Sequence, residues 1–326
     1  MSILDTFVSV AKETGGYGTA TTSSARAFES KNDDFQRDVE YIESVGFRKD
    51  MQTIRSDRHT TISTGATGSI EMDIQNKGLG LLLQGALTTA TSPVQLGATS
   101  GYKSTYESGD ALSSVSYTVQ VGKADTAGSL QSFTYEGSQI TGWSIGQELG
   151  NNASMTFNFD CENEQNSTAL ATPSYPASTT PFNWTNATIE IDDSAISTFT
   201  SFSLDADLAA DTARRFLKGS ATKSQPKMNG VPSYTGSISG EFAAMAQYEA
   251  FCNGTVMKIE FILTGSEIES PYNYVFHVTM PACKFTGSTP VASLDSLSSV
   301  DLPFIALDNG TDAAVKIEVT STDTSF

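Results

Sequence analysis

The chain has 326 residues, enough for two domains that each bury a core, and it carries 37 Asp and Glu against 19 Lys and Arg, for a formal net charge of −18. Nonspecific binding to nucleic acid depends on Lys and Arg neutralising phosphates, so this charge argues against it. It does not exclude a protein that lies near DNA without holding it. Only 17% of the residues are charged, and 18 Phe and 11 Tyr accompany many Ser, Thr and Gly, so the composition favours a β-rich fold.

The cysteines suggest a reducing compartment, and the hydropathy of the chain indicates neither a membrane span nor a signal peptide. Cys161, Cys252 and Cys283 are odd in number and widely spaced, with no CxxC pair, which predicts buried or half-buried thiols and no metal or redox motif. No apolar run is long enough to span a membrane. The first residues, MSILD, lack a basic region followed by an apolar core, so no signal peptide is expected.

The first part of the chain is predicted to be an irregular N-terminal arm over 1–34 and a β domain over 35–162. Alternation predicts strands near 36–45, 57–64 and 66–74, with a charged loop between the first two. A short helix follows near 78–85, and the Thr/Ser/Gly-rich residues 88–112 are interpreted as a long loop. Further strands are predicted at 113–121, 133–135, 139–146 and 154–160.

Residues 163–181, NEQNSTALATPSYPASTTP, are predicted to be a linker because they are rich in Pro, Ser and Thr and have no apolar periodicity. A second β domain is predicted over 182–326. Its expected strands lie at 188–191, 199–208, 235–242, 256–264, 272–280, 299–307 and 316–320, with a short helix at 243–252.

A repeated tetrapeptide connects the two predicted domains. Thr-Gly-Ser-Ile occurs at 67–70 and again at 235–238, each time opening an alternating strand that leads into a short helix. Both helices end near a glycine suited to a C-cap, Gly85 or Gly254. A basic loop precedes each copy. A strand–helix unit repeated at half the chain length predicts two tandem copies of one fold.

Alternation also divides these strands into an apolar and a polar face. In the two units, Ile70, Met72 and Ile238 oppose Glu71, Asp73 and Glu241. In 201–208, the apolar residues alternate with Ser203, Asp205 and Asp207. An ordinary hydrated sheet face explains this pattern without any function.

One motif raises the alternative of a serine hydrolase. Gly142-Trp-Ser144-Ile-Gly146 matches G-x-S-x-G, whose Ser must lie on a sharp turn between a strand and a helix. Here turn residues and another strand follow, and the available base, His277, lies inside a predicted strand. The predicted context therefore contradicts a nucleophile at Ser144, and no catalytic residue is assigned.

No metal or cofactor site is predicted. His59 and His277 have no partner at i+4 and no nearby Cys. The carboxylates of Asp38, Glu40 and Glu43 could suggest a glycosidase pair, but no apolar pocket is indicated that would raise one pKa. Neither a P-loop nor a dinucleotide-type glycine pattern is present.

Several segments, in order, resemble the tail tube (major tail) proteins of long-tailed, non-contractile bacteriophages. Residues 11–20, AKETGGYGTA, are similar to the opening of that family. The other similar segments are ESVGFR at 43–48, GSIE at 68–71, GLGLLL at 78–83, MPAC at 280–283 and LPFIAL at 302–307. The similarity covers nearly the whole chain and depends on the order and spacing of these segments.

The resemblance implies an all-β protein with short helices, in two tandem copies of a tail-tube β-sandwich or barrel, each flanked by a short helix. It implies a structural, non-enzymatic virion protein, made in the host cytoplasm, whose rings stack into a tail tube through which the genome passes. The rings would be trimers with pseudo-sixfold symmetry or hexamers. Implied partners are the tape measure, tail terminator and distal tail proteins; DNA would pass without specific binding, and no membrane is involved. A capsid decoration or adhesin module is the alternative.

The resemblance also implies roles for two sets of charged residues. The first set is acidic, would face the lumen and would repel phosphates: Asp38, Glu40, Glu71, Asp73, Asp205, Asp207 and Glu241. The second set is basic and would lie in loops between stacked rings: Arg48, Lys49, Arg55, Arg58, Arg214, Arg215 and Lys218.

Overall fold

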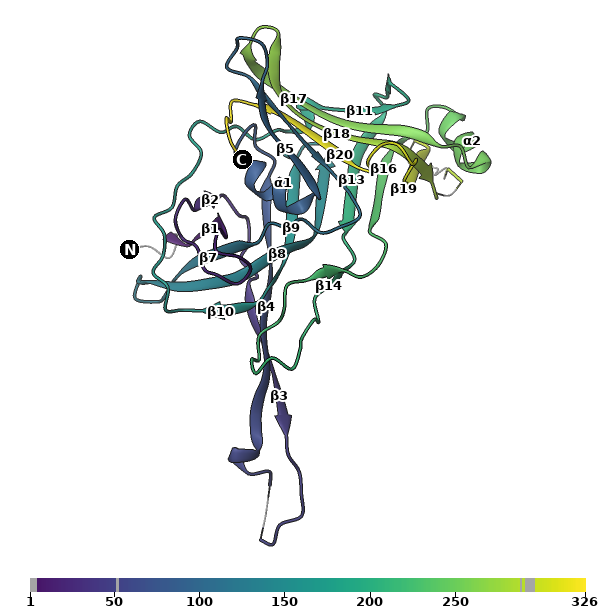
Figure 1. The fold of residues 1–326 in the computed structure, drawn as a ribbon. Helices are drawn as coiled ribbons and strands as arrows, with labels where there is room; N and C mark the ends of the chain where they lie inside the picture. Colours follow the sequence, from purple (N-terminus) through teal and green to yellow (C-terminus); the bar gives the residue numbers. More distant parts are fainter. Residues whose placement is uncertain (1–4, 51–52, 288, 291–296) are drawn as a thin grey trace.

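The computed structural model describes residues 5–50, 53–287, 289–290 and 297–326, and it is a β protein (Figure 1). Two short α-helices, α1 (Gly80–Ala86) and α2 (Ala246–Asn253), accompany the strands. This confirms the predicted all-β class with short helices.

One sheet runs through both halves of the chain, and we call it the inner sheet. Its strands, in spatial order, are β3 (Gln36–Glu43), β4 (His59–Asp73), β9 (Ser154–Cys161), β8 (Leu130–Glu148), β13 (Phe199–Asp207), β16 (Ser233–Glu241) and β19 (Ser299–Ala306). β8 and β13 join the halves: Gly142 to Glu148 pair antiparallel with Asp207 to Ser201. The backbone of the first half is therefore hydrogen-bonded directly to that of the second.

An outer layer covers each half of the inner sheet. In the first half it consists of β2 (Arg26–Phe28), β1 (Phe7–Lys12), β7 (Tyr117–Ala124), the start of β8 and β10 (Asn163–Gln165). In the second half it consists of β12 (Ser194–Ala195), β11 (Ala187–Ile191), β17 (Met257–Glu269), β18 (Tyr272–Phe285) and β20 (Lys316–Ser321). The remaining elements are β5 (Thr89–Gln95), β6 (Tyr102–Glu107), β14 (Ala210–Asp211), β15 (Lys227–Met228) and the 3₁₀ turns Ser56–Arg58 and Trp184–Asn186.

The hydrophobic core fills the space between the layers, as the alternation predicts. Ile70 and Phe157 from the first half, and Leu204 and Ile238 from the second, are fully buried on the inward side of the inner sheet. The ring of Phe202 stacks on Phe261 of β17 with centroids 4.4 Å apart. Because side chains alternate across a strand, the opposite side of the inner sheet receives the polar residues.

The order of strand pairing is the same in the two halves. β2-β1-β7-β8-β10 in the first outer layer corresponds to β12-β11-β17-β18-β20 in the second. In the inner sheet, β3-β4-β9-β8 corresponds to β13-β16-β19-β18. The same pairing order is expected for two tandem copies of one fold. That the two halves superpose stays a prediction.

The N-terminal residues were wrongly predicted to be irregular. β1 and β2 lie within 5–34, and β1 is buried apart from Lys12 because it pairs along its whole length with β7. Of the predicted arm, residues 1–4 lie outside the described residues. The signal that was missed is the short, nearly continuous apolar run over 7–11, which is typical of a strand buried on both faces.

The loop predicted at 88–112 is also wrong, because it contains the β5–β6 hairpin. The pairing shifts between Thr91 and Val94, which accommodates Pro93 at an irregularity where no ladder hydrogen bond is required. β6 pairs along β20, so this hairpin extends the outer layer of the second half. That pairing is nonlocal and has no local signature in the sequence.

Three smaller expectations also need correction. Gly254 is a left-handed C-cap with φ 62°, as predicted, but Gly85 lies inside α1, where a Cβ would come within 2.5 Å of the Tyr117 ring. The 163–181 linker begins with β10, paired to β8. Cys161 and Cys283 are buried as expected, but Cys252 is exposed.

The family-like segment at 11–20 builds a buried hydrogen-bond network around Glu13. The Glu13 carboxylate accepts from the backbone N–H of Gly18 (3.0 Å) and Gly137 (2.8 Å). It also accepts from the hydroxyls of Ser116 (2.6 Å) and Thr118 (3.1 Å). Burial raises the pKa of Glu13, and these four donors oppose that rise.

We expect Glu13→Ala to lower the free energy of unfolding by roughly 3 kcal/mol, because it leaves buried donors without an acceptor. Denaturant unfolding of the monomer measures this. Lys12→Ala is the control, since Lys12 is exposed and its replacement should cost less than about 0.5 kcal/mol. Equal losses in the two variants would contradict the structural role of Glu13.

Candidate functional site

The polar face of the inner sheet is the candidate functional surface, and the ladder registers align its residues in rows across both halves. One row runs Glu71, Thr156, Ser144, Asp205, Thr235 and Ile305. The next runs Asp73, Ser154, Gly146, Ser203, Ser237 and Pro303. The rows present mainly hydroxyls and carboxylates.

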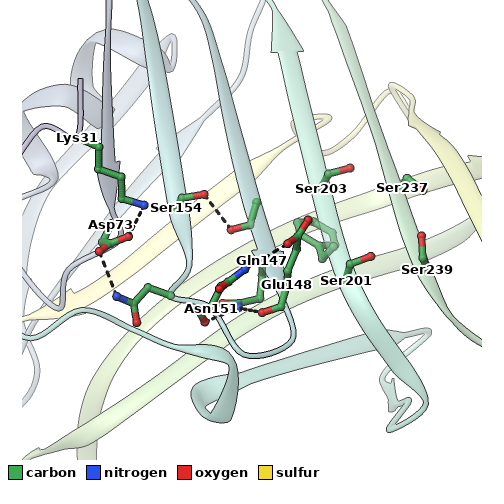
Figure 2. Close-up of a pocket in the computed structure, with 13 residues that line it drawn as sticks. Lys31, Asp73, Gln147, Glu148, Asn151, Ser154, Ser201, Ser203, Ser237 and Ser239 are labelled. Carbon is green, nitrogen blue, oxygen red and sulfur yellow. Dashed lines mark hydrogen bonds and ion pairs between the residues drawn. The ribbon is translucent and has the colours of Figure 1, made fainter. Parts of the chain in front are cut away.

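Figure 2 shows one end of this face, where residues from both halves surround a shallow polar hollow. Ser201, Ser203, Ser237 and Ser239 come from β13 and β16 of the second half. Across the hollow, Asp73 accepts from Lys31 (2.7 Å) and from Asn152 (3.1 Å). The arrangement is open and hydrated, and its hydroxyls can exchange bonds with water.

Five of the seven predicted acidic residues lie on the strands that carry this face, spread from β4 to β16. Glu71 and Asp73 on β4 share the face with Asp205 and Asp207 on β13, and Glu241 ends β16. Asp205 and Asp207 are exposed, whereas Glu71 and Asp73 are half-buried.

The other two predicted acids, Asp38 and Glu40, lie on β3, opposite Gly65 and Ser63 of β4. The ladder places them on the same side as Glu71, but farther along, where β3 and β4 leave the body as a long arm (Figure 1). They are thus near the root of this arm and not beside the serine-lined hollow.

Two acidic residues beside the serine-lined hollow were not predicted from the sequence. Asp301 of β19 accepts from Ser237 (2.5 Å) and Ser239 (2.7 Å). Glu148 ends β8 opposite Ser201. The alternation of Asp301 with Val300 and Leu302 could have identified the first, whereas the position of Glu148 depends on the pairing of β8 with β13.

A buried ion pair fixes the long β13–β16 loop (208–232) against the first half. Lys223 Nζ lies 2.5 Å from Asp160 Oδ1 of β9, with both side chains at most 5% exposed. Beside it the Thr64 N–H donates to the carbonyl of Ala221 (3.0 Å). Burial raises the pKa of Asp160, and the Lys223 ammonium opposes that rise.

The predicted basic residues fall into two structurally different groups. Arg48, Lys49, Arg55 and Arg58 lie in the exposed part of the β3–β4 arm, where Arg55 pairs with Asp57 (2.7 Å). The other group lies in the β13–β16 loop: Arg214 donates to the Gln225 carbonyl, and Lys218 to the Lys223 carbonyl. The first group therefore projects from the body of the molecule. In the second group, Arg214 and Lys218 are hydrogen-bonded to carbonyls of their own loop.

The arm also exposes apolar side chains. Tyr41, Ile42, Val45 and Phe47 are each more than half exposed, and Phe47 is fully so. A cluster of exposed apolar residues beside cations is typical of an interaction surface. Among the described residues, no contact buries the side chain of Phe47.

Ser144 does not occupy a nucleophile elbow. It lies inside β8, between Thr156 of β9 and Asp205 of β13, so no strand–turn–helix places it at a tip. His277 lies on β18, where its Nε2 is 2.9 Å from Glu260. The G-x-S-x-G match is thus explained by a strand in which Ser144 contributes one hydroxyl to the polar face.

Neither a metal-binding cluster nor a membrane-spanning helix is found among the described residues. No group of three or more His, Cys, Asp or Glu is placed to bind a metal ion. Neither described helix has the length and hydropathy needed to cross a membrane.

The fold is an all-β fold whose inner sheet carries one polar face, and a comparison with known families identifies the class of protein. The family model for phage tail tube proteins matches residues 4–323, nearly the whole chain. The chain therefore belongs to the phage tail tube protein family, a family of structural proteins of the virion tail. A search of curated proteins found no match.

We expect Lys223→Met to lower the free energy of unfolding at pH 7 by about 3–5 kcal/mol, because Asp160 would keep a buried charge without a partner. Without Lys223 the pKa of Asp160 rises further, and it is the ionised form that costs stability. The loss should therefore shrink as the pH falls toward 4. Denaturant unfolding at both pH values measures this.

Two controls accompany this measurement. The double variant Lys223→Met/Asp160→Leu should recover most of the stability, because no buried charge remains. Lys227→Met, at an exposed position in the same loop, should change little. An equal loss at pH 7 and pH 4 would show that packing, and not charge, holds the loop.

Proposed function

We propose that this chain is the tail tube subunit itself: copies join into rings, rings stack into a tube, and the polar face of the inner sheet lines the lumen through which the genome passes. It has no catalytic role in this proposal. The supporting observation is the inner sheet, which is continuous across both halves and carries hydroxyls and carboxylates in rows on one face.

The charge of this face suits passage of DNA. Duplex DNA carries about one negative charge per 1.7 Å of its axis, and a cationic wall would hold it through counterion release. Lys31 and Lys223, which reach this face, each contact a carboxylate. Phosphates would therefore meet hydroxyls, water and net negative charge.

The junction between β8 and β13 suggests how rings close. In the pairing order, β18 corresponds to β8 and β3 corresponds to β13. β18 pairs with β19 at Cys283 to Phe285, and β3 pairs on one side with β4. If β18 of one copy is placed beside β3 of the next, the intrachain junction is repeated between chains.

Repeating that junction supports trimers with pseudo-sixfold symmetry, with hexamers as the alternative. In this proposal the two copies are still divided near the predicted linker at 163–181, but β1 and β2 of the predicted N-terminal arm (1–34) and β10 at the start of the linker belong to the first copy, which the sequence placed at 35–162; the second copy remains 182–326.

The β3–β4 arm is the proposed contact between stacked rings. It projects beyond the layers and presents Phe47, Arg48 and Lys49 (Figure 1). The basic loop residues Arg214, Arg215 and Lys218 would contribute from the β13–β16 loop. The tape measure, tail terminator and distal tail proteins would contact the lumen and the tube ends, after synthesis in the host cytoplasm.

Negative-stain microscopy of the purified protein tests this function directly, since stacked hollow rings are expected. Compact closed particles without tubes would favour a capsid decoration or adhesin module instead.

Reversing the charge of the polar face should slow genome release. We expect Glu71→Lys/Asp205→Lys/Asp207→Lys to form tubes but to slow DNA ejection by roughly tenfold, because the new cations attract phosphates. The measurement is DNA release from particles assembled with the variant. Glu267→Lys/Asp110→Lys, at exposed positions outside the inner sheet, is the control and should leave the rate unchanged. Loss of assembly with normal ejection from surviving particles would place these residues in an interface.

Changing the arm should affect stacking and leave the monomer intact. We expect Phe47→Ser/Arg48→Glu to fold with an unchanged unfolding transition, because both side chains are exposed, but to give rings or monomers in place of tubes. Tube length by microscopy and monomer unfolding are measured together. Val94→Ser, another exposed apolar position, should stack normally. Wild-type tube lengths in the arm variant would remove the arm from the stacking interface.

A further inference from the structure

Phe182, the residue that directly follows the linker, fills a gap in the first half. The Phe182 N–H donates to the Ile74 carbonyl (2.9 Å), and the Ala153 N–H donates to the Phe182 carbonyl (2.9 Å). Phe182 is 3% exposed. Phe182 thus bridges the ends of β4 and β9 and closes that end of the core.

At the corresponding gap in the second half, the part of the chain that the structure describes provides no such residue. There the Phe242 N–H donates to Ser298 O (2.9 Å), matching the bond from Ile74 N–H to Ala153 O (2.8 Å) in the first half. Among the described residues, nothing bridges the Phe242 carbonyl and the Ser298 N–H as Phe182 bridges their counterparts. An unpaired N–H and C=O at a sheet end form a template for another strand.

The empty volume beside the two gaps also differs, and it is larger in the second half. In the second half a hollow of about 240 Å³ is lined mainly by apolar side chains, among them Ile196, Phe199, Phe242, Tyr248 and Val300. At the corresponding place in the first half, where Tyr175 and Pro176 of the linker lie, only about 10 Å³ is left.

The two helices beside these spaces also differ. α1 contains five buried residues, whereas α2 contains none. Within the described residues, the second half therefore has no counterpart of the covering segment that the linker supplies to the first half.

Strand register identifies which segment would correspond to the linker. Val10 pairs with Val119, which pairs with Tyr135; Ile191 pairs with Ile259, which pairs with Met280. Val10 and Ile191 therefore occupy corresponding rungs. Phe182 lies nine residues before Ile191, and Met1 lies nine residues before Val10.

We propose that residues 1–4 of a neighbouring copy, Met-Ser-Ile-Leu, cover the hollow of the second half, and that Met1 adds to the Phe242 and Ser298 backbone as Phe182 adds to Ile74 and Ala153. The proposal rests on the ring assembly proposed above, because the donor is the next copy in the ring. Three of the four residues in this segment, Met1, Ile3 and Leu4, are apolar, which suits the apolar lining of the hollow.

Hydrogen exchange of the unmodified protein provides the first test. The Ser298 amide should exchange freely in the monomer and slow by about tenfold or more in the tube, because it gains an acceptor. The Ala153 amide is the matched control and should be protected in both states, since its acceptor lies within the chain. Unchanged exchange at Ser298 in well-formed tubes would overturn the proposal.

Cysteine crosslinking provides the second test, in a Cys252→Ser background that removes the exposed native thiol. Ser2→Cys/Ala243→Cys should form disulfide-linked chains in tubes under mild oxidation, and not in dilute monomer. Ser2→Cys/Val231→Cys, with an exposed partner outside the hollow, should stay unlinked.

The outcomes separate this inference from the proposed function. Tubes without the Ser2–Ala243 crosslink would overturn the exchange of N-terminal segments and leave the tube function standing; they would point to another tail protein or no segment in the hollow. Failure of the wild-type protein to assemble at all would count against the proposed function, and the inference would fall with it.

Discussion

Backbone pairing between β8 and β13 is the constraint on which the rest of the structure depends. It joins two halves that each have their own outer layer into one inner sheet. A strand edge left open is a site for pairing with any other chain, so covering one edge within the molecule leaves the outermost edges for assembly. The same pairing aligns polar residues from both halves in common rows, and no single half could produce those rows.

Because β8 pairs with β13, the polar face is formed jointly by strands of both halves. Asp205 owes its place beside Ser144 to the β8–β13 register, and Asp301 receives hydrogen bonds from serines of β16. Because these groups lie in water, they contribute little to stability and are free to set the charge of the surface. Stability comes instead from the apolar residues on the other side of the same strands.

Differences between the two halves carry as much information as their similarities. The β3–β4 arm projects freely, whereas the corresponding β13–β16 loop is fixed on the first half by the pair of Lys223 and Asp160. At the position of Asp160, the second half has Ile305, so no matching ion pair can form there. In a similar way, the linker covers the core at Ile74, and the second half has no described equivalent at Phe242.

The sequence by itself determined the β class, most strands, the two short helices and the division of the strands into polar and apolar faces, because alternation reflects burial directly. It also identified five acidic residues that the strand registers place on one face of the inner sheet. The tertiary structure alone decided that β5 and β6 extend the second half, that Ser144 is one hydroxyl in a row, and that Lys223 is buried against Asp160. Each of these depends on contacts between residues far apart in the chain. Local residue patterns report burial and turn chemistry, but which strand lies beside which is fixed only when the whole sheet forms.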